Sequence, residues 1–491
     1  MTNYQMYIDG GFCDASDGGR FDSINPATGK VWATAPAATE TDVDRAVTAA
    51  RRAMDEGEWS EMTATGRGRL LFELADLMAE NSEHLGSIET TDSGKLAVET
   101  RGQSAYVAEY YRYYAGLADK IQGSTLPMDK PDMHVFTTRE PIGVVAGIVP
   151  WNAEMLLTAT KAAPALAAGN AVVIKSSEDA PAPVLEFAKL VDRVGFPDGV
   201  FNLITGFGEP CGRALTSHPL VSRVAFTGGV DAARKVVANT AGNFAHLSLE
   251  LGGKSPILVF DDADLEGAVN GAIAGNFGAT GQSCVAGSRV LVQAGIHDDF
   301  IRETVKRAEA VRIGDPLDES TQMGPLATEA QRDRIEAVVA ESLDQGAVLH
   351  TGGRRPGGFD AGWYYEPTIL GCPNQAIRST RVELFGPVMS VIPFGTEDEG
   401  VALANDTEFG LGAGVFTRDV ARAHRVAAAI RSGIVWVNTY RAISPIAPFG
   451  GFGQSGYGRE SGIDAIYEYT RTKSVWINTS TQPMANPFVM R

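Results

Sequence analysis

Apolar side chains recur at intervals of three and four residues in three N-terminal segments, residues 41–56, 65–81 and 96–118. This spacing predicts helices with one apolar face each. Tyrosine is frequent in the third segment, and we interpret that stripe as a packed helix face. From Gly143 onward the pattern changes, because short continuous apolar runs begin to alternate with helical stretches.

The runs after Gly143 have the character of buried strands. They occupy residues 144–149, 171–174, 200–204, 221–226 and 246–251, and helical stretches separate most of them. Such alternation predicts a parallel sheet covered by helices on both faces. A second series of the same kind runs from about residue 252 to 438, so we expect an α/β chain with two sheets.

Polar residues and glycines follow these predicted strands at their carboxyl ends. In chain order they are Asn152, Lys175, residues 206–208, residues 227–229 and Glu250. Ligands of parallel sheets bind at this edge. We therefore expect these residues to converge on one ligand site.

Two strand-like segments lie outside both series. Residues 123–139 alternate polar and apolar side chains around prolines, which is typical of an edge hairpin, and residues 472–478 also have the pattern of a strand. Neither segment has an evident partner nearby in the sequence. We expect both to pair with another subunit.

Composition narrows the classes of function. Lys and Arg number 42 against 60 Asp and Glu, and the net charge of −18 disfavours nucleic acid and anionic membranes as partners. The four cysteines lie far apart, so we expect neither a zinc site nor disulfides, but a reduced, cytoplasmic protein. We also expect no bound metal, no signal peptide and no membrane span.

Three residues are candidates for catalysis. Cys284 lies among glycines and small polar residues, a setting that suits a nucleophile or a structural thiol equally well. Glu250 ends an apolar strand, where a carboxylate acts as a base, pairs with Lys254 or caps the next helix. Asn152 follows a strand and either caps a helix or donates its amide N–H to an oxyanion.

Other strand ends indicate nucleotide binding. Lys175 and Glu178 suit ribose hydroxyls and a nearby phosphate. The glycines of residues 227–229 precede a helix, where backbone N–H groups can approach a phosphate closely. The glycines of residues 206–212 fall one residue off the dinucleotide fingerprint, and a plain turn explains them equally well.

Taken together, these segments resemble the NAD(P)-dependent aldehyde dehydrogenase superfamily, in its hydrolytic type that does not acylate coenzyme A. Matching pieces follow one another along nearly the whole chain, and their order and spacing argue against chance. They are Asn25-Pro26-Ala27-Thr28-Gly29, Pro150-Trp151-Asn152, Lys175-Ser176-Ser177-Glu178, Phe226-Thr227-Gly228, Glu250-Leu251-Gly252-Gly253-Lys254, Gly281-Gln282-Ser283-Cys284, Glu383-Leu384-Phe385-Gly386-Pro387 and Pro448-Phe449-Gly450-Gly451.

The resemblance implies an aldehyde-dehydrogenase-like fold with two doubly wound parallel-sheet domains and a small β oligomerisation arm. Residues 1–122 and 142–251 would form a discontinuous NAD-binding domain, and residues 252–440 a catalytic domain. Residues 441–467 would return to the NAD-binding domain, and residues 123–141 with 468–491 would form the arm. A homodimer or homotetramer is implied as well.

The resemblance also implies a role for each matched position. Cys284 would be the nucleophile, Glu250 the general base, and the Asn152 amide an oxyanion donor together with the backbone N–H of Cys284. Lys161 and Glu460 match a proposed proton relay. The cofactor positions are Trp151, Lys175, Ser177, Glu178, Gly208, Thr227, Gly228, Gly229, Leu251, Glu383 and Phe385. The substrate positions are Ala153, Leu156, Leu157, Val285, Arg441, Ile443 and Phe449.

These implied roles describe the oxidation of a small-molecule aldehyde to a carboxylate with NAD, through a thiohemiacetal and a thioester on Cys284. Glu250 favours hydrolysis of the thioester, because similar members that transfer the acyl group to coenzyme A typically lack this glutamate. The glutamate at position 178 favours NAD over NADP. Arg441 and Ser444 suit a polar or carboxylated substrate, unless Arg441 faces a subunit contact or solvent.

The chain departs from the family pattern at two places. Gly229 stands where Ser or Thr is frequent, and Glu154 stands where proline is common, so Glu154 would face the substrate entrance or cap a helix. Two other functions stay open. One is a cysteine hydrolase with a histidine such as His246 as its base, which hydride uptake by the nicotinamide would exclude. The other is a non-catalytic structural relative, which failure to bind NAD would favour.

Overall fold

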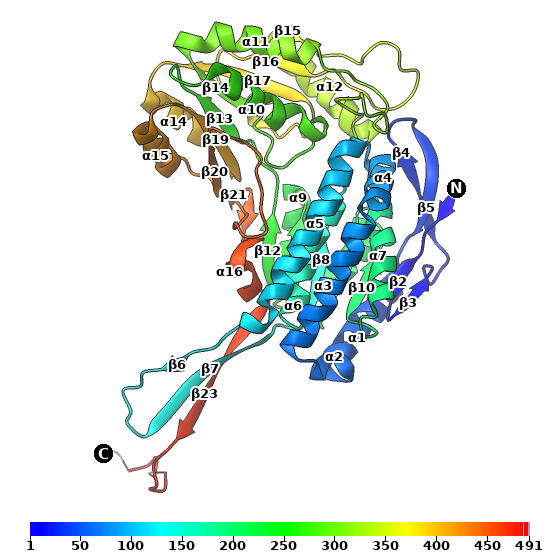
Figure 1. The fold of residues 1–491 in the computed structure, drawn as a ribbon, viewed down its shortest axis with the longest axis vertical. Helices are drawn as coiled ribbons and strands as arrows, with labels where there is room; N and C mark the ends of the chain where they lie inside the picture. Colours follow the sequence, from blue (N-terminus) through cyan, green and yellow to red (C-terminus); the bar gives the residue numbers. More distant parts are fainter. Residues whose placement is uncertain (485, 490–491) are drawn as a thin grey trace.

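The computed structural model describes residues 1–484 and 486–489, and it has two sheet-centred parts with a long arm projecting from one end (Figure 1). One part contains an eight-stranded sheet in the order β22-β12-β11-β8-β9-β10-β2-β3. Its parallel strands are β8 (Val144–Ile148), β9 (Ala171–Lys175), β10 (Phe201–Ile204), β11 (Val221–Thr227) and β12 (His246–Glu250). Antiparallel strands extend its two edges, namely β22 (Gly456–Tyr457), β2 (Met6–Ile8) and β3 (Gly11–Cys13).

Helices cover both faces of this sheet. One face packs against α3 (Ala64–Glu80), α4 (Ser82–Ser93), α5 (Ala97–Leu117), α6 (Glu154–Ala167) and α7 (Ala182–Val194). The other face packs against α1 (Glu40–Asp55), α8 (Arg213–Ser217) and α9 (Val230–Asn239). Val144 and Val145 of β8 belong to opposite apolar clusters, because successive side chains of a strand point to opposite faces.

The second part contains a seven-stranded sheet in the order β15-β16-β17-β14-β13-β19-β20. Its strands are β13 (Pro256–Val259), β14 (Arg289–Gln293), β15 (Val348–Thr351), β16 (Thr368–Gly371), β17 (Val388–Phe394), β19 (Gly412–Phe416) and β20 (Ile434–Val437). One face packs against α10 (Leu265–Phe277) and α11 (His297–Glu309). The other packs against α12 (Glu329–Asp344), α14 (Glu397–Asn405) and α15 (Val420–Ala429).

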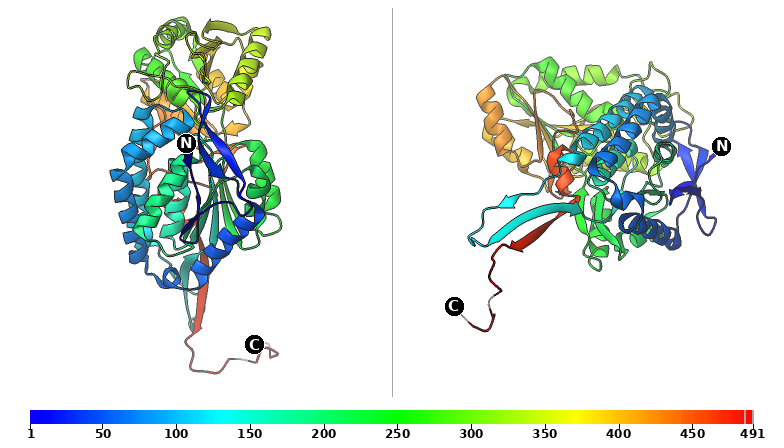
Figure 2. Two further views of the ribbon diagram at one scale, coloured as in Figure 1. Left: turned by 90° about the vertical axis from the view of Figure 1, so that its right-hand side faces the viewer. Right: turned by 60° about the horizontal axis from the view of Figure 1, so that its bottom comes forward.

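The arm is a three-stranded antiparallel sheet in the order β23-β7-β6, which extends away from both larger sheets (Figure 2). Its strands are β6 (Thr125–Leu126), β7 (Met133–Pro141) and β23 (Thr470–Asn478). We expected both segments to pair with another subunit. In the structure β23 and β7 pair with each other along their full length, so the expectation is wrong for the edge that these two strands share. Residues 485, 490 and 491 of the predicted arm lie outside the described residues.

The α/β fold class expected from the sequence is confirmed, whereas the division into domains stays a proposal. Sequence reasoning missed several short elements. At the N-terminus these are β1 (Thr2–Asn3), β4 (Arg20–Asn25) and β5 (Lys30–Pro36), and further along they are α2 (Glu58–Glu61), α13 (Arg378–Arg381), β18 (Phe409–Gly410), β21 (Phe452–Gly453) and α16 (Gly462–Tyr467). The shortest of these elements carry too few positions for a periodic pattern, and in β4 and β5 polar and apolar side chains do not alternate regularly.

Candidate active site

Cys284 lies in the loop between α10 and β14, directly after a bend with an unusual backbone. Ala279, Thr280 and Gly281 have φ angles of 51°, 54° and 72°, a region that is costly for residues other than glycine. A side chain at Gly281 would collide with the backbone of Gly386. The bend is therefore packed closely against the backbone at Gly386, and this packing fixes the position of the thiol.

Glu250 ends β12, and its carboxylate is buried without a structural partner. The residue is 3% exposed, and neither carboxylate oxygen has a hydrogen-bond partner within the described part of the chain. The proposed salt bridge with Lys254 is absent there too, because the Lys254 ammonium is itself buried and unbonded among the described residues. Burial, and then the Glu460 carboxylate, raise the pKa of Glu250 well above its usual value. Such a carboxyl fits a general base.

Asn152 connects β8 to the loop that holds the cysteine. Its Nδ2 donates to the backbone oxygen of Gln282 at 3.1 Å. The helix-cap interpretation is wrong, because α6 begins at Glu154 with Ala153 as its N-cap and without a side-chain cap. Glu154 does not cap the helix either, since both of its carboxylate oxygens are buried and bond to no described residue. One amide N–H of Asn152 is left for a ligand.

A buried ion pair lies beside Glu250. Nζ of Lys161 on α6 donates to Oε1 of Glu460 at 2.6 Å and to Oγ1 of Thr227 at 2.6 Å. The hydroxyl of Thr160 donates to the other oxygen of Glu460 at 2.8 Å. Mutual neutralisation and these extra hydrogen bonds compensate the desolvation of both charges. The structure thus brings Lys161 and Glu460 together and places them next to the candidate base.

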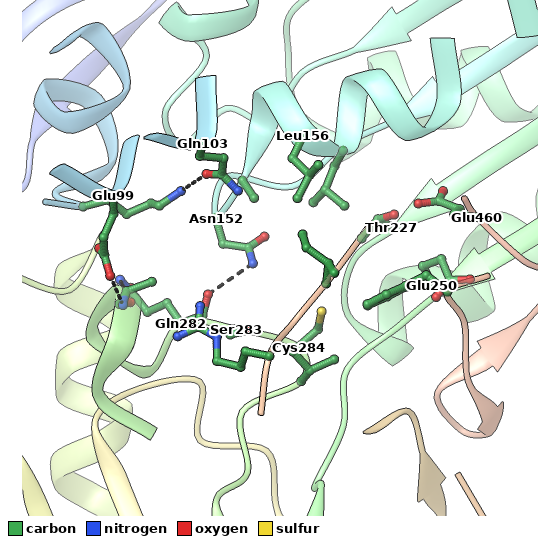
Figure 3. Close-up of a pocket in the computed structure, with 18 of the residues that line it drawn as sticks. Glu99, Gln103, Asn152, Leu156, Thr227, Glu250, Gln282, Ser283, Cys284 and Glu460 are labelled. Carbon is green, nitrogen blue, oxygen red and sulfur yellow. Dashed lines mark hydrogen bonds between the residues drawn. The ribbon is translucent and has the colours of Figure 1, made fainter. Parts of the chain in front are cut away.

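Two cavities meet at Cys284. The larger has a volume of about 340 Å³ and the smaller about 190 Å³. Both are lined by Cys284, Glu250 and Asn152, and Figure 3 shows Asn152 on one side of the cysteine and Glu250 on the other. A separate ligand can therefore approach the thiol from each cavity.

The residues predicted from the sequence divide between these cavities. The larger one is lined by every predicted substrate position, Ala153, Leu156, Leu157, Val285, Arg441, Ile443 and Phe449. The smaller one is lined by most of the predicted cofactor positions, Trp151, Thr227, Gly228, Gly229, Leu251, Glu383 and Phe385. The remaining cofactor positions line neither cavity. Lys175 ends β9, Ser177 and Glu178 follow that strand, and Gly208 follows β10.

The smaller cavity combines an aromatic wall, a buried carboxyl and an open glycine. The rings of Trp151 and Phe385 lie edge to face with centroids 5.4 Å apart and form an aromatic wall. Oε1 of Glu383 accepts the N–H of Gly253 at 3.0 Å, and burial raises the pKa of this carboxyl to about 7. Around Gly229 there is open space where a side chain would otherwise stand, so a phosphate can approach its backbone.

A charged pair lies at the end of β9. Nζ of Lys175 is 3.6 Å from a carboxylate oxygen of Glu178, and it also donates to the backbone oxygen of Ser176 at 3.0 Å. The Glu178 side chain is 39% exposed, so it is available to a ligand. The Ser177 hydroxyl accepts the backbone N–H of Asp179 at 3.2 Å, which gives this serine a structural hydrogen bond in the turn.

Sequence reasoning missed six residues that line the larger cavity. They are Lys95, Glu99, Gln103, Ala279, Gln282 and Ser283. Three of these flank the cysteine on the chain and could have been included by proximity alone. Glu99 and Gln103 lie four residues apart on α5 and share one helix face, whereas Lys95 lies just before the helix. The polar spacing of Glu99 and Gln103 is the signal that could have indicated this wall.

The environment of the Cys284 thiol opposes its ionisation. Burial, followed by the Glu383 and Glu250 carboxylates, raises the pKa of Cys284 to about 12. The backbone N–H of Val285 and the charge of Arg441 act in the opposite direction. The thiol therefore holds its proton near neutral pH, and its activation needs a base.

In this α/β fold a cysteine lies where two cavities meet, an arrangement that fits an enzyme acting on two bound ligands, and sequence comparison agrees with this interpretation. The family model described as the aldehyde dehydrogenase family matches residues 12–475, and the chain belongs to this family. It is therefore an oxidoreductase that acts on aldehydes. This membership disfavours both alternatives, the hydrolase and the non-catalytic relative.

Similar proteins cover the full length of the chain. The (Z)-2-((N-methylformamido)methylene)-5-hydroxybutyrolactone dehydrogenase of Acinetobacter baylyi is 55% identical over 100% of both chains. The betaine aldehyde dehydrogenase of Mesorhizobium japonicum is 42% identical over 98% of both chains. A solved structure of the betaine aldehyde dehydrogenase of Staphylococcus aureus in complex with NAD+ has a TM-score of 0.97 at 39% identity, and covers 99% of this chain and 97% of its own.

No group of three or more potential metal-binding side chains occurs in residues 1–484 and 486–489. Within the same ranges, no helix combines the length and the apolar character that a membrane crossing requires.

Proposed function

We propose that this enzyme oxidises a small aldehyde that also carries a carboxylate, and that it prefers NAD to NADP. The observation that carries the substrate class is Arg441, a cation on the wall of the larger cavity. Its Nη1 donates to the backbone oxygen of Ala274 at 2.9 Å, its one hydrogen bond to a described residue. The other guanidinium N–H groups can therefore bind both oxygens of a carboxylate.

The relative from Acinetobacter baylyi supports this class. Its name gives a 5-hydroxybutyrolactone as the compound that it dehydrogenates. Such a lactone is the ring-closed form of a short aldehyde acid, because opening of the ring releases an aldehyde and a carboxylate. An open-chain substrate of this kind would present its aldehyde to Cys284 and its carboxylate to Arg441.

The first half of the proposed reaction takes place at Cys284. The thiol gives its proton to the Glu250 carboxylate, the sulfur bonds to the aldehyde carbon, and the electron pair of the carbonyl double bond moves to oxygen, which becomes the oxyanion of a thiohemiacetal. Nδ2 of Asn152 and the backbone N–H of Cys284 donate to that oxyanion. Loss of one such donor typically lowers the rate by about 10²- to 10³-fold.

The smaller cavity and the end of β9 would hold the cofactor. Bound NAD supplies the acceptor for the hydride that leaves the substrate carbon, after which the cysteine carries a thioester. Trp151, Glu383 and Phe385 would hold the nicotinamide half, and Lys175 and Glu178 the ribose of the adenosine half. A carboxylate at that ribose binds its hydroxyls and repels a 2′-phosphate.

Glu250 carries the second half of the proposed reaction. Its carboxylate takes a proton from a water molecule, and the water oxygen bonds to the thioester carbon. The carbon–sulfur bond then breaks, which releases the carboxylate product and returns the cysteine. The pair of Lys161 and Glu460 beside the base offers a route by which the captured proton can leave.

The substrate proposal is tested by substituting Arg441. We would measure kcat/KM from the absorbance of reduced cofactor, with 4-oxobutanoate as the carboxylated aldehyde and butanal as its uncharged counterpart. Arg441→Met should lower the ratio of the two values about 10-fold or more, and Arg441→Lys should restore part of it. The matched control is Arg302→Met, on the exposed side of α11. An equal loss with both aldehydes would contradict a role in substrate choice.

The cofactor proposal is tested at Glu178. Glu178→Ala removes the carboxylate that would repel a 2′-phosphate, so the ratio of NADP-dependent to NAD-dependent kcat/KM should rise about 10-fold. Glu209→Ala is a matched control on an exposed carboxylate of the neighbouring loop. A ratio that is unchanged in Glu178→Ala would exclude this residue from cofactor choice.

A further inference from the structure

One wall of the larger cavity is polar, and the residues that form it come from the start of α5. Lys95 precedes this helix, and Glu99 and Gln103 lie on its first turns, all three along the cavity. Figure 3 shows Glu99 and Gln103 on this wall, across the cavity from Cys284. The proposed mechanism uses none of these residues.

A chain of hydrogen bonds runs from the protein interior to this wall. Glu89 on α4 is completely buried, and its Oε1 accepts a hydrogen bond from Nζ of Lys95 at 2.8 Å. The same Nζ donates to Oε1 of Gln103 at 2.5 Å. The ammonium of Lys95 is thus held between a buried carboxylate and the side-chain amide of Gln103.

The direction of these bonds fixes the orientation of the Gln103 amide. An ammonium group has donors and no acceptor, so the atom of Gln103 that faces Lys95 must be the carbonyl oxygen. The amide NH2 group then points away from the lysine. It donates to none of the described residues, so both of its N–H groups are available to a ligand in the cavity.

The charge of Lys95 itself is balanced within the protein. Besides Glu89, the buried carboxyls of Glu154 and Asp92 lie close enough to interact electrostatically with this cluster. Among these carboxyls, Glu89 contacts the ammonium directly, and this buried ion pair holds Lys95 in place and leaves little net positive charge toward the cavity. The group that faces the ligand is therefore the neutral donor of Gln103 rather than the cation.

We propose that Gln103 is a specificity-determining residue that donates hydrogen bonds to a neutral carbonyl oxygen of the substrate, such as that of an amide or ester. Lys95 is the positioning residue that holds the Gln103 amide in its donating orientation, and Glu89 holds Lys95. The substrate thus carries two oxygen functions besides its aldehyde, with the carboxylate at Arg441 and the neutral carbonyl at Gln103. This inference rests on the proposed function of the larger cavity as the substrate site.

The test uses two aldehydes that differ in one acceptor. N,N-Dimethyl-4-oxobutanamide carries a neutral carbonyl oxygen and cannot close to a ring, and 5-methylhexanal has a similar branched shape without that oxygen. For the purified full-length enzyme with NAD, we expect kcat/KM to be higher for the amide. Gln103→Leu should lower the amide-to-alkyl ratio about 10-fold or more, because the lost donor leaves the carbonyl oxygen unbonded.

Two comparisons make this result specific. Gln122→Leu replaces an exposed glutamine just beyond α5, and it should keep the wild-type ratio. Lys95→Met combined with Glu89→Gln removes both members of the positioning pair, so neither is left as a buried charge without its partner, and it should lower the ratio although Gln103 is present. Turnover of 5-methylhexanal in each variant reports that the enzyme is folded.

The outcomes separate this inference from the function on which it rests. A ratio that Gln103→Leu leaves unchanged overturns the role of Gln103, whatever Arg441→Met does to the oxidation of 4-oxobutanoate. A loss of the amide-to-alkyl ratio in Gln103→Leu supports it, even if Arg441 proves unimportant for carboxylates. If the Lys95→Met and Glu89→Gln double variant keeps the wild-type ratio, the positioning role of Lys95 is overturned.

Discussion

The surroundings of Cys284, the proposed nucleophile, oppose the ionisation of its thiol. Its thiol lies near two carboxylates, Glu383 and Glu250, whose negative charges oppose the formation of a thiolate. Both carboxylates have proposed functions of their own, one at the cofactor and one at water. The cost of placing them near the sulfur is a thiol that ionises with difficulty until a ligand or a base assists it.

The reactivity of the thiol should therefore respond to Glu383. Glu383→Gln removes a negative charge that raises the pKa of Cys284, so alkylation of Cys284 by iodoacetamide should become several-fold faster at pH 8.5. This pH lies above the pKa of about 7 of Glu383, so the wild-type carboxyl is charged. Alkylation of each cysteine is followed by peptide mass spectrometry, with Cys13 as an internal reference. Equal rates in both proteins would contradict the electrostatic account.

The ion pair of Lys161 and Glu460 makes a second prediction for single residues. Lys161→Met leaves the Glu460 carboxylate buried without its cation, which should lower the free energy of unfolding by about 3–5 kcal/mol. The double variant with Glu460→Gln carries no buried charge and should recover much of this loss. Urea unfolding followed by tryptophan fluorescence measures both. Additive losses in the double variant would show that the two side chains do not interact.

At the scale of elements, the sequence predicted long periodic segments well and short or weakly patterned ones poorly. Helices α3 and α5 lie within about one residue of the predicted segments. Helix α4 was missed, because residues 82–93 are mostly polar or small and show no continuous apolar stripe. The pairing of β23 with β7 joins segments more than 300 residues apart, and no local pattern reports such a contact.

The same limit applies to the site. Strand-end reasoning brought Asn152 and Glu250 together, because the ends of parallel strands must share an edge, and the family resemblance added Cys284. The polar wall of Lys95 and Gln103 was not predicted, since it depends on how α5 packs beside the cavity. That packing is a tertiary contact, and the sequence pattern of α5 indicates only a helix with one apolar face.

The start of α1 offers a prediction at this scale. Thr39 and Asp42 form a capping box, in which the Thr39 hydroxyl accepts the N–H of Asp42 and the Asp42 carboxylate accepts the N–H of Thr39 at 2.9 Å. Thr39→Ala should lower the free energy of unfolding by about 1 kcal/mol, whereas Thr39→Ser should have little effect. Urea titration measures the difference. Equal stability of Thr39→Ala and the wild type would show that the Asp42 carboxylate suffices as the cap.

At the scale of the whole molecule, the site depends on both large sheets. Glu250, Asn152 and Thr227 come from the ends of strands in the eight-stranded sheet, whereas Cys284 and Glu383 come from loops of the seven-stranded sheet. Neither sheet alone carries the proposed nucleophile together with its base. Any change in the relative position of the two parts therefore alters the distance between the reacting groups, so rigid packing between them is a condition for catalysis.

The arm lies apart from the site, and none of its described residues lines either cavity. It projects from the body with apolar side chains in solvent, and Trp476 and Ile477 of β23 are 56% and 45% exposed. Among the described strands, β23 is paired only with β7, so its other edge is open. An open strand edge with exposed apolar side chains is a suitable surface for a second copy of the chain. We therefore propose that the enzyme is a homodimer or homotetramer assembled through this arm.

Charged substitutions on the arm test this assembly. Trp476→Glu with Ile477→Lys should lower the molar mass measured by light scattering to that of a smaller assembly or a monomer, because charges are costly to bury in an apolar interface. The matched control is Val348→Lys with Leu349→Glu on β15, an exposed apolar pair on the edge of the seven-stranded sheet, which should keep the wild-type mass. Because the arm lies apart from both cavities, a dissociated variant should still bind NAD. If the arm variant keeps the wild-type mass, the subunits associate through another surface.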